Sequence, residues 1–179
     1  MKNIIILLGK SASGKDTILK ELNKILNYNI IVSWTSRPIR DNETQDLDYH
    51  FVTKEKFISE IPNLVEYRTY NTLLNGNSEI WYYGIHKSSL KNNSIVITDL
   101  DGYKSLEKYS PKAFYINVPD NIRTERAKKR ASFSLPEWNR RLQDDNIKFS
   151  QIPKDIKIIK NDNITTTIDE ILKILGHLR

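Results

Sequence analysis

The chain is 179 residues long, contains no cysteine and carries a formal net charge of +6 at neutral pH. This length suits one domain with a sizeable core, and the lack of cysteine excludes disulfides, thiolate zinc sites and a cysteine nucleophile. The excess of basic residues predicts an anionic partner, which charge alone leaves open as nucleic acid, a membrane surface or small phosphate compounds.

The N-terminal end offers neither a membrane span nor a signal peptide. No apolar run approaches the length that crosses a bilayer, and residues 1–3 lead directly into an expected strand. We therefore expect a cytoplasmic protein.

The stretch Ile4–Thr17 reads IIILLGKSASGKDT and has three consecutive parts. Five apolar residues, Ile4–Leu8, predict a strand buried on both faces of a parallel sheet, and apolar spacing over Thr17–Leu26 predicts a helix. Between them lies the pattern G-x4-G-K, so the context predicts a phosphate-binding loop whose backbone N–H groups and Lys15 hold phosphates. The residues expected to bind ATP here are Gly9, Ser11, Ala12, Ser13, Gly14, Lys15, Asp16 and Thr17.

Short strands and loops are expected next along the chain. Asn29–Ser33 predicts a second buried strand, and Trp34–Arg40 predicts a loop because Pro38 prevents continued strand pairing. Tyr49–Val52 predicts another strand. Thr53 has the features of an N-cap for a helix that begins after it.

A polar segment and an apolar strand follow. Leu64–Tyr67 is a strand candidate, whereas the Asn- and Gly-rich stretch Asn71–Glu79 is expected to be a flexible loop. Ser94–Leu100 predicts a strand that presents Asp99 at its end, with Asp101 two positions further on. A Walker-B-like carboxylate is presented in this way, and a turn or a helix cap is the alternative interpretation.

The C-terminal half continues the alternation of strands and helices. The expected elements are a strand over Lys112–Val118, a helix from Pro119 through Arg130, a helix opened by a capping box at Ser134–Glu137, a strand over Asp155–Lys160 and a final helix that Gly176 ends. This alternation predicts an α/β fold with a parallel sheet and helices on both faces.

Three pairs of arginines follow the phosphate-binding loop, namely Arg37 with Arg40, Arg126 with Arg130, and Arg140 with Arg141. A protein that joins two phosphate compounds must offset repulsion between two polyanions, and the arginine fork binds phosphate bidentately. One pair alone is compatible with a solvated basic surface. All three together, after such a loop, favour a function in phosphate binding.

On these residues the chain resembles the guanylate kinases, within the P-loop nucleoside-monophosphate kinases. The likeness runs nearly end to end and is densest in Ser33–Val52, where SWTSRPIR and DYHFV look like the family's acceptor-binding segment. The resemblance implies a P-loop NTPase-type parallel sheet flanked by helices, with an inserted nucleotide-acceptor domain and a small lid. It divides the single domain 1–179 into a core of 1–33, 87–125 and 142–179, an acceptor-binding subdomain of 34–86 and a lid of 126–141.

The resemblance also implies transfer of the γ-phosphate of ATP to GMP or dGMP with Mg²⁺. The implied acceptor-binding residues are Ser33, Arg37, Arg40, Tyr49, Glu66, Tyr83 and Asp101, with Ser33, Glu66 and Asp101 at the guanine. The implied catalytic residues are Lys15, Arg37, Arg126, Arg130 and Arg141. Asn161 would lie near the adenine of ATP. Asp99 would lie near the magnesium ion. Because Asp16 replaces the serine or threonine that usually follows the loop lysine, the other metal contact is expected from Asp16, Thr17 or water.

Two features depart from the family's pattern. Ile85 stands where a hydroxyl residue usually reads the base, and several extra residues lie between Glu66 and Tyr83. Phosphoryl transfer to a monophosphate is therefore better supported than guanine as the base. The alternatives are a kinase of another small phosphate monoester, such as ribose 1,5-bisphosphate, and a non-catalytic guanylate-kinase-like binding module, against which the intact loop with Lys15 argues.

Small-molecule nucleotides are the expected partners. Nucleic acid ranks lowest because the basic residues fall at phosphate-transfer positions and not in a stripe interleaved with aromatic residues. No membrane partner is expected, and we expect a monomer or a homodimer.

Overall fold

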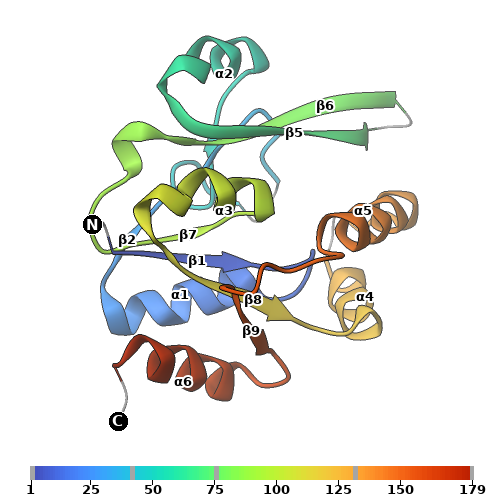
Figure 1. The fold of residues 1–179 in the computed structure, drawn as a ribbon. Helices are drawn as coiled ribbons and strands as arrows, with labels where there is room; N and C mark the ends of the chain where they lie inside the picture. The colour runs from blue at the N-terminus through green and yellow to red at the C-terminus, as the bar shows by residue number, and fades with distance from the viewer. Residues whose placement is uncertain (1–2, 41–42, 75–76, 131–132, 178–179) are drawn as a thin grey trace.

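A five-stranded parallel sheet forms the centre of the molecule (Figure 1). The computed structural model describes residues 3–40, 43–74, 77–130 and 133–177. The strand order is β2-β7-β1-β8-β9, and every neighbouring pair is parallel. The strands are β1 (Ile4–Leu8), β2 (Asn29–Ile30), β7 (Ser94–Ile97), β8 (Lys112–Asn117) and β9 (Lys157–Lys160). The predicted α/β fold with a parallel sheet is confirmed.

Helices cover both faces of this sheet. They are α1 (Lys15–Leu26), α3 (Leu100–Leu106), α4 (Asp120–Lys128), α5 (Leu135–Lys148) and α6 (Ile164–Leu175), with short 3₁₀ turns at Ile61–Asn63, Lys87–Ser89 and Glu107–Tyr109. Figure 1 shows α1 and α6 on one face and α3 on the other. The α6 helix ends at Gly176, whose φ of 81° is the left-handed conformation that glycine adopts easily.

The central strand β1 is buried on both sides because its side chains alternate between two cores. Ile4 and Ile6 pack in the core that includes α3, whereas Ile5 and Leu7 pack in the core that includes α1 and α6. Successive side chains of a strand point to opposite faces, so a strand covered on both faces is apolar at every position. The uninterrupted apolar run in the sequence has this cause.

A second sheet of four strands stands apart from the first, with the order β4-β3-β6-β5. Its elements are β3 (Trp34–Thr35), β4 (His50–Phe51), β5 (Leu64–Leu74) and β6 (Asn77–His86), with helix α2 (Lys54–Glu60) packed against it. The hydroxyl of Thr53 accepts a hydrogen bond from the backbone N–H of Lys56 at 3.2 Å, which confirms the predicted N-cap.

The predicted flexible loop over residues 71–79 is wrong. The antiparallel β5–β6 ladder continues through this segment as far as the Leu74–Asn77 pair, and Thr72 is buried within it. Residues 75–76 lie outside the described residues. A two-residue alternation built from polar side chains carries no hydrophobic signal, so the composition suggested a loop where long-range pairing makes a strand.

Three smaller predictions also differ from the structure. Trp34–Thr35 forms strand β3, although a loop was expected over the whole of its segment. Helix α4 ends at Lys128, so Arg130 lies beyond the helix that was expected to run through it. Ser134 occupies the N-cap of α5, but its side chain makes no capping hydrogen bond, and the Glu137 carboxylate of the expected capping box binds Arg140 and Arg141 of its own helix.

The two-core packing predicts very different costs for one substitution made at two positions of α1. Ile18 is fully buried, whereas Ile25 is 59% exposed. We expect Ile18→Ala to lower the free energy of unfolding by about 2–5 kcal/mol. Ile25→Ala should change it by no more than about 0.5 kcal/mol. Urea unfolding of both variants checks this, and equal losses would contradict the packing described for α1.

Candidate functional site

The phosphate-binding loop follows β1 and needs glycine at two positions. Gly9 has a φ of 150°, and a Cβ added to it would lie 2.7 Å from the backbone oxygen of Ile116. Gly14 has a φ of 94° and forms the N-cap of α1 without a side-chain cap. The first N–H groups of α1 therefore face the loop, where unpaired helix N–H groups and the helix dipole favour an anion.

A buried ion pair between Arg123 and Asp145 holds this loop in place through Ser11. Arg123 is fully buried, and its Nη1 donates to the backbone oxygen of Ser11 at 2.8 Å and to Asp145 Oδ2 at 3.0 Å. The same Asp145 oxygen accepts the backbone N–H of Ser11 at 2.7 Å. Both residues were missed by the sequence analysis, because Asp145 lies on α5 and only the folded chain brings it to the loop.

Asn161 and Arg126 contact the other end of the loop. Asn161 is buried after β9, and its amide donates to the backbone oxygen of Ser13 at 2.8 Å. Arg126 lies 3.4 Å from the same oxygen and 3.3 Å from the backbone oxygen of Asn161. Neither side chain lines the two clefts described below. They are therefore placed beside the loop, away from the converging arginines.

Lys15 projects into the loop from the first turn of α1. Its Nζ donates to the backbone oxygens of Gly9 at 2.7 Å and Lys10 at 3.0 Å. Burial lowers the pKa of Lys15. Two adjoining clefts meet at this loop, and both are lined by Lys15 and Ser11.

The larger cleft, of about 820 Å³, concentrates positive charge. Seven basic and three acidic side chains line it, and the basic ones come from α1, from the segments around β3 and after α4, and from α5. The basic residues are Lys15, Lys20, Arg37, Arg40, Lys129, Arg130 and Arg141. Burial, followed by repulsion from Arg37 and Arg141, lowers the pKa of Arg40, so both of these guanidinium groups lie close enough to Arg40 to repel it. The cleft suits a polyanion.

Arg37 lines this cleft, and its guanidinium is fixed by neighbouring side chains. Its fork donates to both oxygens of Glu43 at 2.7 and 2.9 Å, and its side chain is 3% exposed. The guanidinium also lies 5.5 Å from the centre of the Tyr49 ring, which meets Tyr83 edge to face at 5.8 Å. The structure thus brings together four of the predicted acceptor-binding residues, Arg37, Arg40, Tyr49 and Tyr83, in one cleft.

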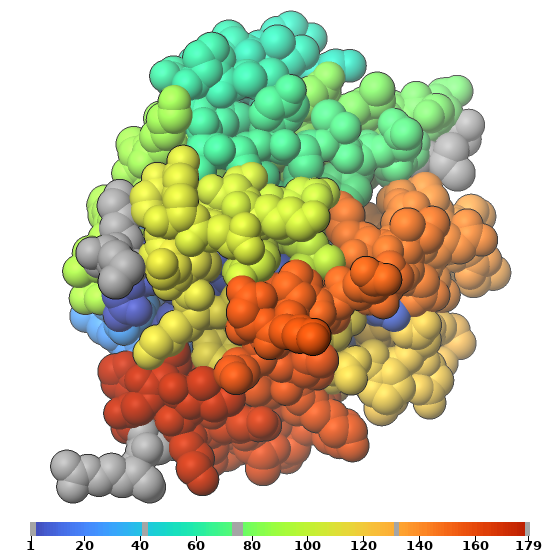
Figure 2. Space-filling view, viewed as in Figure 1, coloured from blue at the N-terminus to red at the C-terminus, as the bar shows by residue number. Residues whose placement is uncertain are grey.

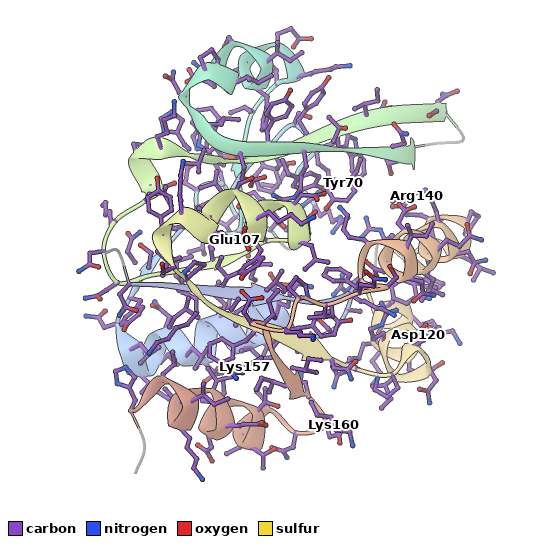
Figure 3. All side chains as sticks on the ribbon, in the orientation of Figure 1. Tyr70, Glu107, Asp120, Arg140, Lys157 and Lys160 are labelled. Atoms are coloured by element: carbon purple, nitrogen blue, oxygen red, sulfur yellow. The ribbon has the colours of Figure 1, made fainter. Side chains whose placement is uncertain are left out.

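A smaller adjoining cleft, of about 220 Å³, lies between the β5–β6 hairpin and α5. Alternate residues of the hairpin line it, namely Arg68, Tyr70, Trp81 and Tyr83. Tyr70 on β5 and Arg140 on α5 face each other across this region (Figure 3). Figure 2 shows the atoms of α5, in orange, against those of the hairpin, in green.

The acidic residues predicted for the site occupy different positions. Asp99 lines the smaller cleft and also caps α3 through the N–H of Gly102 at 3.1 Å. Glu66 is buried and paired with Arg68 at 2.6 Å, and burial raises the pKa of Glu66. Asp101 is exposed in the first turn of α3 and lines neither cleft.

Other predicted residues lie at the edges of the site. Asp16 and Thr17 are exposed on the first turn of α1 and line the larger cleft. Ser33 is buried, lines a third, small cavity beside Tyr49, and accepts the backbone N–H of His50 through its own backbone oxygen. Within the described residues, no group of three histidine, cysteine, aspartate or glutamate residues could hold a metal ion by itself. Among the same residues, no helix has the length and apolarity needed to cross a membrane.

Arg68 and Lys148 are two further residues of the site that the sequence analysis did not predict. The alternation of Glu66, Arg68 and Tyr70 along one strand face is the signal that could have found Arg68. Lys148 ends α5 and reaches Asp99 at 2.6 Å across 49 residues of sequence. No local pattern encodes that approach.

Comparison with known proteins agrees with this architecture. A family model described as guanylate kinase matches residues 1–178. The guanylate kinase of Helicobacter hepaticus is 30% identical over 98% of this chain and 90% of its own length. That of Onion yellows phytoplasma is 31% identical over 96% of this chain and 84% of its own.

Solved structures show the same fold. The crystal structure of guanylate kinase from Anaplasma phagocytophilum matches with a TM-score of 0.67 and 24% identity, over 98% of this chain and 85% of that one. A sugar kinase from Janibacter sp. matches with a TM-score of 0.58 at 13% identity, over 98% and 95% of the two chains, which is a likeness of fold alone. From the family model and the full-length relatives, the chain belongs to the guanylate kinase family.

Proposed function

We propose that this protein transfers the γ-phosphate of ATP to GMP or dGMP, giving ADP and the nucleoside diphosphate. The observation that carries the proposal is the single cleft in which Lys15 and arginines from three segments of the chain converge beside a phosphate-binding loop. Members of the guanylate kinase family phosphorylate GMP using ATP, and the chain matches that family over nearly its whole length. A cytoplasmic location is part of the same proposal.

The proposed division of labour follows the two sheets. Residues 34–86, which contain the second sheet, would hold the acceptor, with Arg37, Arg40, Tyr49 and Tyr83 around its phosphate. Residues 126–141 would form a lid that brings Arg130 and Arg141 to the ATP phosphates, with Arg126 beside the loop. Of this range, residues 131–132 lie outside the described residues. The remaining segments would form the core.

The chemistry asks little of the side chains beyond charge and position. The attacking oxygen of an acceptor phosphate is already ionised at neutral pH, so the protein needs no general base. Lys15 and the lid arginines would neutralise the charge that the three transferred oxygens carry in the transition state. Closure of the lid would keep water from the γ-phosphate.

Magnesium fits the exposed face of α1 better than the end of β7. Mg²⁺ bound with ATP usually takes one or two protein ligands and fills its remaining positions with phosphate oxygens and water. Asp16 and Thr17 offer such oxygens in the larger cleft. Both oxygens of Asp99 already accept protein donors, including Lys148 and the N–H of Gly102. When bound, Mg²⁺ would offset negative charge on the phosphates.

A panel of phosphate acceptors tests the proposed reaction. We expect ADP release from Mg-ATP with GMP and dGMP, and far less with AMP, UMP, dTMP or ribose 1,5-bisphosphate. If only ribose 1,5-bisphosphate supports ADP release, the acceptor is a sugar phosphate and not a nucleotide. If none of these compounds supports ADP release, the alternative of a non-catalytic guanylate-kinase-like binding module is favoured.

Substitution of Lys15 tests the role of the loop. Lys15→Met removes the ammonium that faces the transferred phosphoryl group, so we expect kcat to fall about a thousandfold while the fold is retained. The matched control is Lys24→Met on the same helix, because the Lys24 side chain is 69% exposed and, among the described residues, pairs with Glu21 alone. Steady-state kinetics with thermal unfolding of both variants measures this, and near-normal turnover in Lys15→Met would remove Lys15 from the mechanism.

The acid stability of the proposed lid depends on Glu137. Burial opposes its ionisation, but hydrogen bonds from Arg140 and Arg141 outweigh this and lower the pKa of Glu137 from an ordinary 4.5 to about 2. A depressed carboxylate pKa stabilises the fold above about pH 4.5 and loses that contribution as the pH falls towards 2. Between about pH 4.5 and pH 2, the free energy of unfolding of Glu137→Gln should therefore fall less steeply with pH than that of the wild type. Urea midpoints measured across this range of pH check the sign, and profiles of equal slope would contradict the assignment.

A further inference from the structure

A buried ionic cluster occupies the floor of the smaller cleft. Arg68 Nη1 donates to Glu66 Oε1 at 2.6 Å, and Arg68 Nε lies 3.2 Å from Asp99 Oδ2. The Arg68 side chain is only 12% exposed, yet it lines the cleft. The guanidinium is therefore fixed between two carboxylates while one side of it faces the open space.

The two carboxylates of this cluster are already neutralised by the protein. Asp99 Oδ2 also accepts the Tyr70 hydroxyl at 2.5 Å and the Lys148 ammonium at 2.6 Å. Two cations, Arg68 and Lys148, thus match two carboxylates, Glu66 and Asp99. Burial opposes ionisation of Asp99, but the positive charge of Arg68 and Lys148 holds its pKa well below the usual range. The floor presents hydrogen-bond donors more than free acceptors.

One nitrogen of Arg68 is left over. A guanidinium has five N–H donors in a planar fork, and the structure pairs Nη1 with Glu66 and places Nε beside Asp99. Nη2 donates no hydrogen bond to any of the described residues. Because Tyr70, Trp81 and Tyr83 form the adjoining wall, the cleft combines aromatic faces with an unused, charge-assisted donor.

Ile85 contributes nothing polar to this wall. It is fully buried and packs in the core with residues of β1 and α3. Ile85 is the cross-strand partner of Glu66, and the next pair on the same face is Arg68 with Tyr83. Directly opposite residues of an antiparallel pair share a face, so Arg68 lies on the same face as Ile85, one cross-strand pair further along the hairpin.

We propose that Arg68 determines the base specificity of the acceptor site, by donating through Nη2 to O6 of guanine. The inference rests on the proposed reaction and adds to it the residue that reads this oxygen. A guanidinium N–H forms a strong, charge-assisted hydrogen bond with an acceptor such as O6. Adenine carries an amino group in place of O6, and this donor would face the Nη2 donor of Arg68.

The test compares substrates that differ at the contacted atom. GMP, 6-thio-GMP and IMP are assayed with Mg-ATP, because sulfur is a weaker acceptor than O6 and IMP lacks only the 2-amino group. We expect the wild type to prefer GMP over 6-thio-GMP by about tenfold or more in kcat/KM, as a hydrogen bond to a charged donor implies. Arg68→Lys keeps the charge between Glu66 and Asp99 but loses the second fork nitrogen. In this variant the preference should fall to within about threefold, while the preference for GMP over IMP and the KM for ATP stay unchanged.

A second variant separates base reading from a general loosening of the cluster. Tyr70→Phe removes a hydrogen bond to Asp99 but leaves the Arg68 guanidinium and the aromatic wall in place. It should retain the wild-type preference for GMP over 6-thio-GMP. Loss of the preference in both variants, or its retention in Arg68→Lys, would overturn the assignment of Arg68 while leaving the proposed reaction standing. A wild type that turns over no purine monophosphate would instead overturn the proposed reaction, and the reading of the base with it.

Discussion

Electrostatic repulsion between the phosphates of two bound anionic molecules is the main constraint on a site of this kind. Two polyanions can meet only where fixed positive charge outweighs the charge that they bring, and the larger cleft supplies seven basic side chains against three acidic ones. No single element could carry so many cations without severe repulsion among them. In this fold the basic side chains come from separate segments of the chain. Two of them are also paired with carboxylates, Arg37 with Glu43 and Arg141 with Glu137.

The parallel sheet explains why these segments meet. The phosphate-binding loop follows β1, Asp99 follows β7, and Asn161 follows β9. The carboxyl ends of parallel strands lie at one edge of a sheet, so each of these residues reaches the same side of the molecule. Helix α5 then closes the site through Asp145, which binds the loop, and through Lys148, which binds Asp99. The phosphate-binding loop and the smaller cleft are therefore both joined to the C-terminal half of α5, which continues directly from the proposed lid.

Sequence could predict the parts of this molecule whose signal is local. The apolar run of β1, the glycine spacing of the loop and the Thr53 cap each lie within a few residues, and the structure has all three. The β5–β6 hairpin could not be predicted from polarity, because its pattern is a pairing between two polar strands. Contacts such as that of Arg123 with Asp145 were also hidden, since the partners stand on different helices and only tertiary packing brings them together.

In the proposed reaction, one cleft would receive the phosphates of both nucleotides between Lys15 and the arginines of the acceptor and lid segments. The most direct measurement is a crystal structure with a dinucleotide in which adenosine and guanosine are joined by bridging phosphates. The account predicts phosphate oxygens within hydrogen-bond distance of Lys15 Nζ and of the Arg37 and Arg141 guanidinium groups. A phosphate chain bound outside this cleft, or these cations turned away from it, would contradict the account.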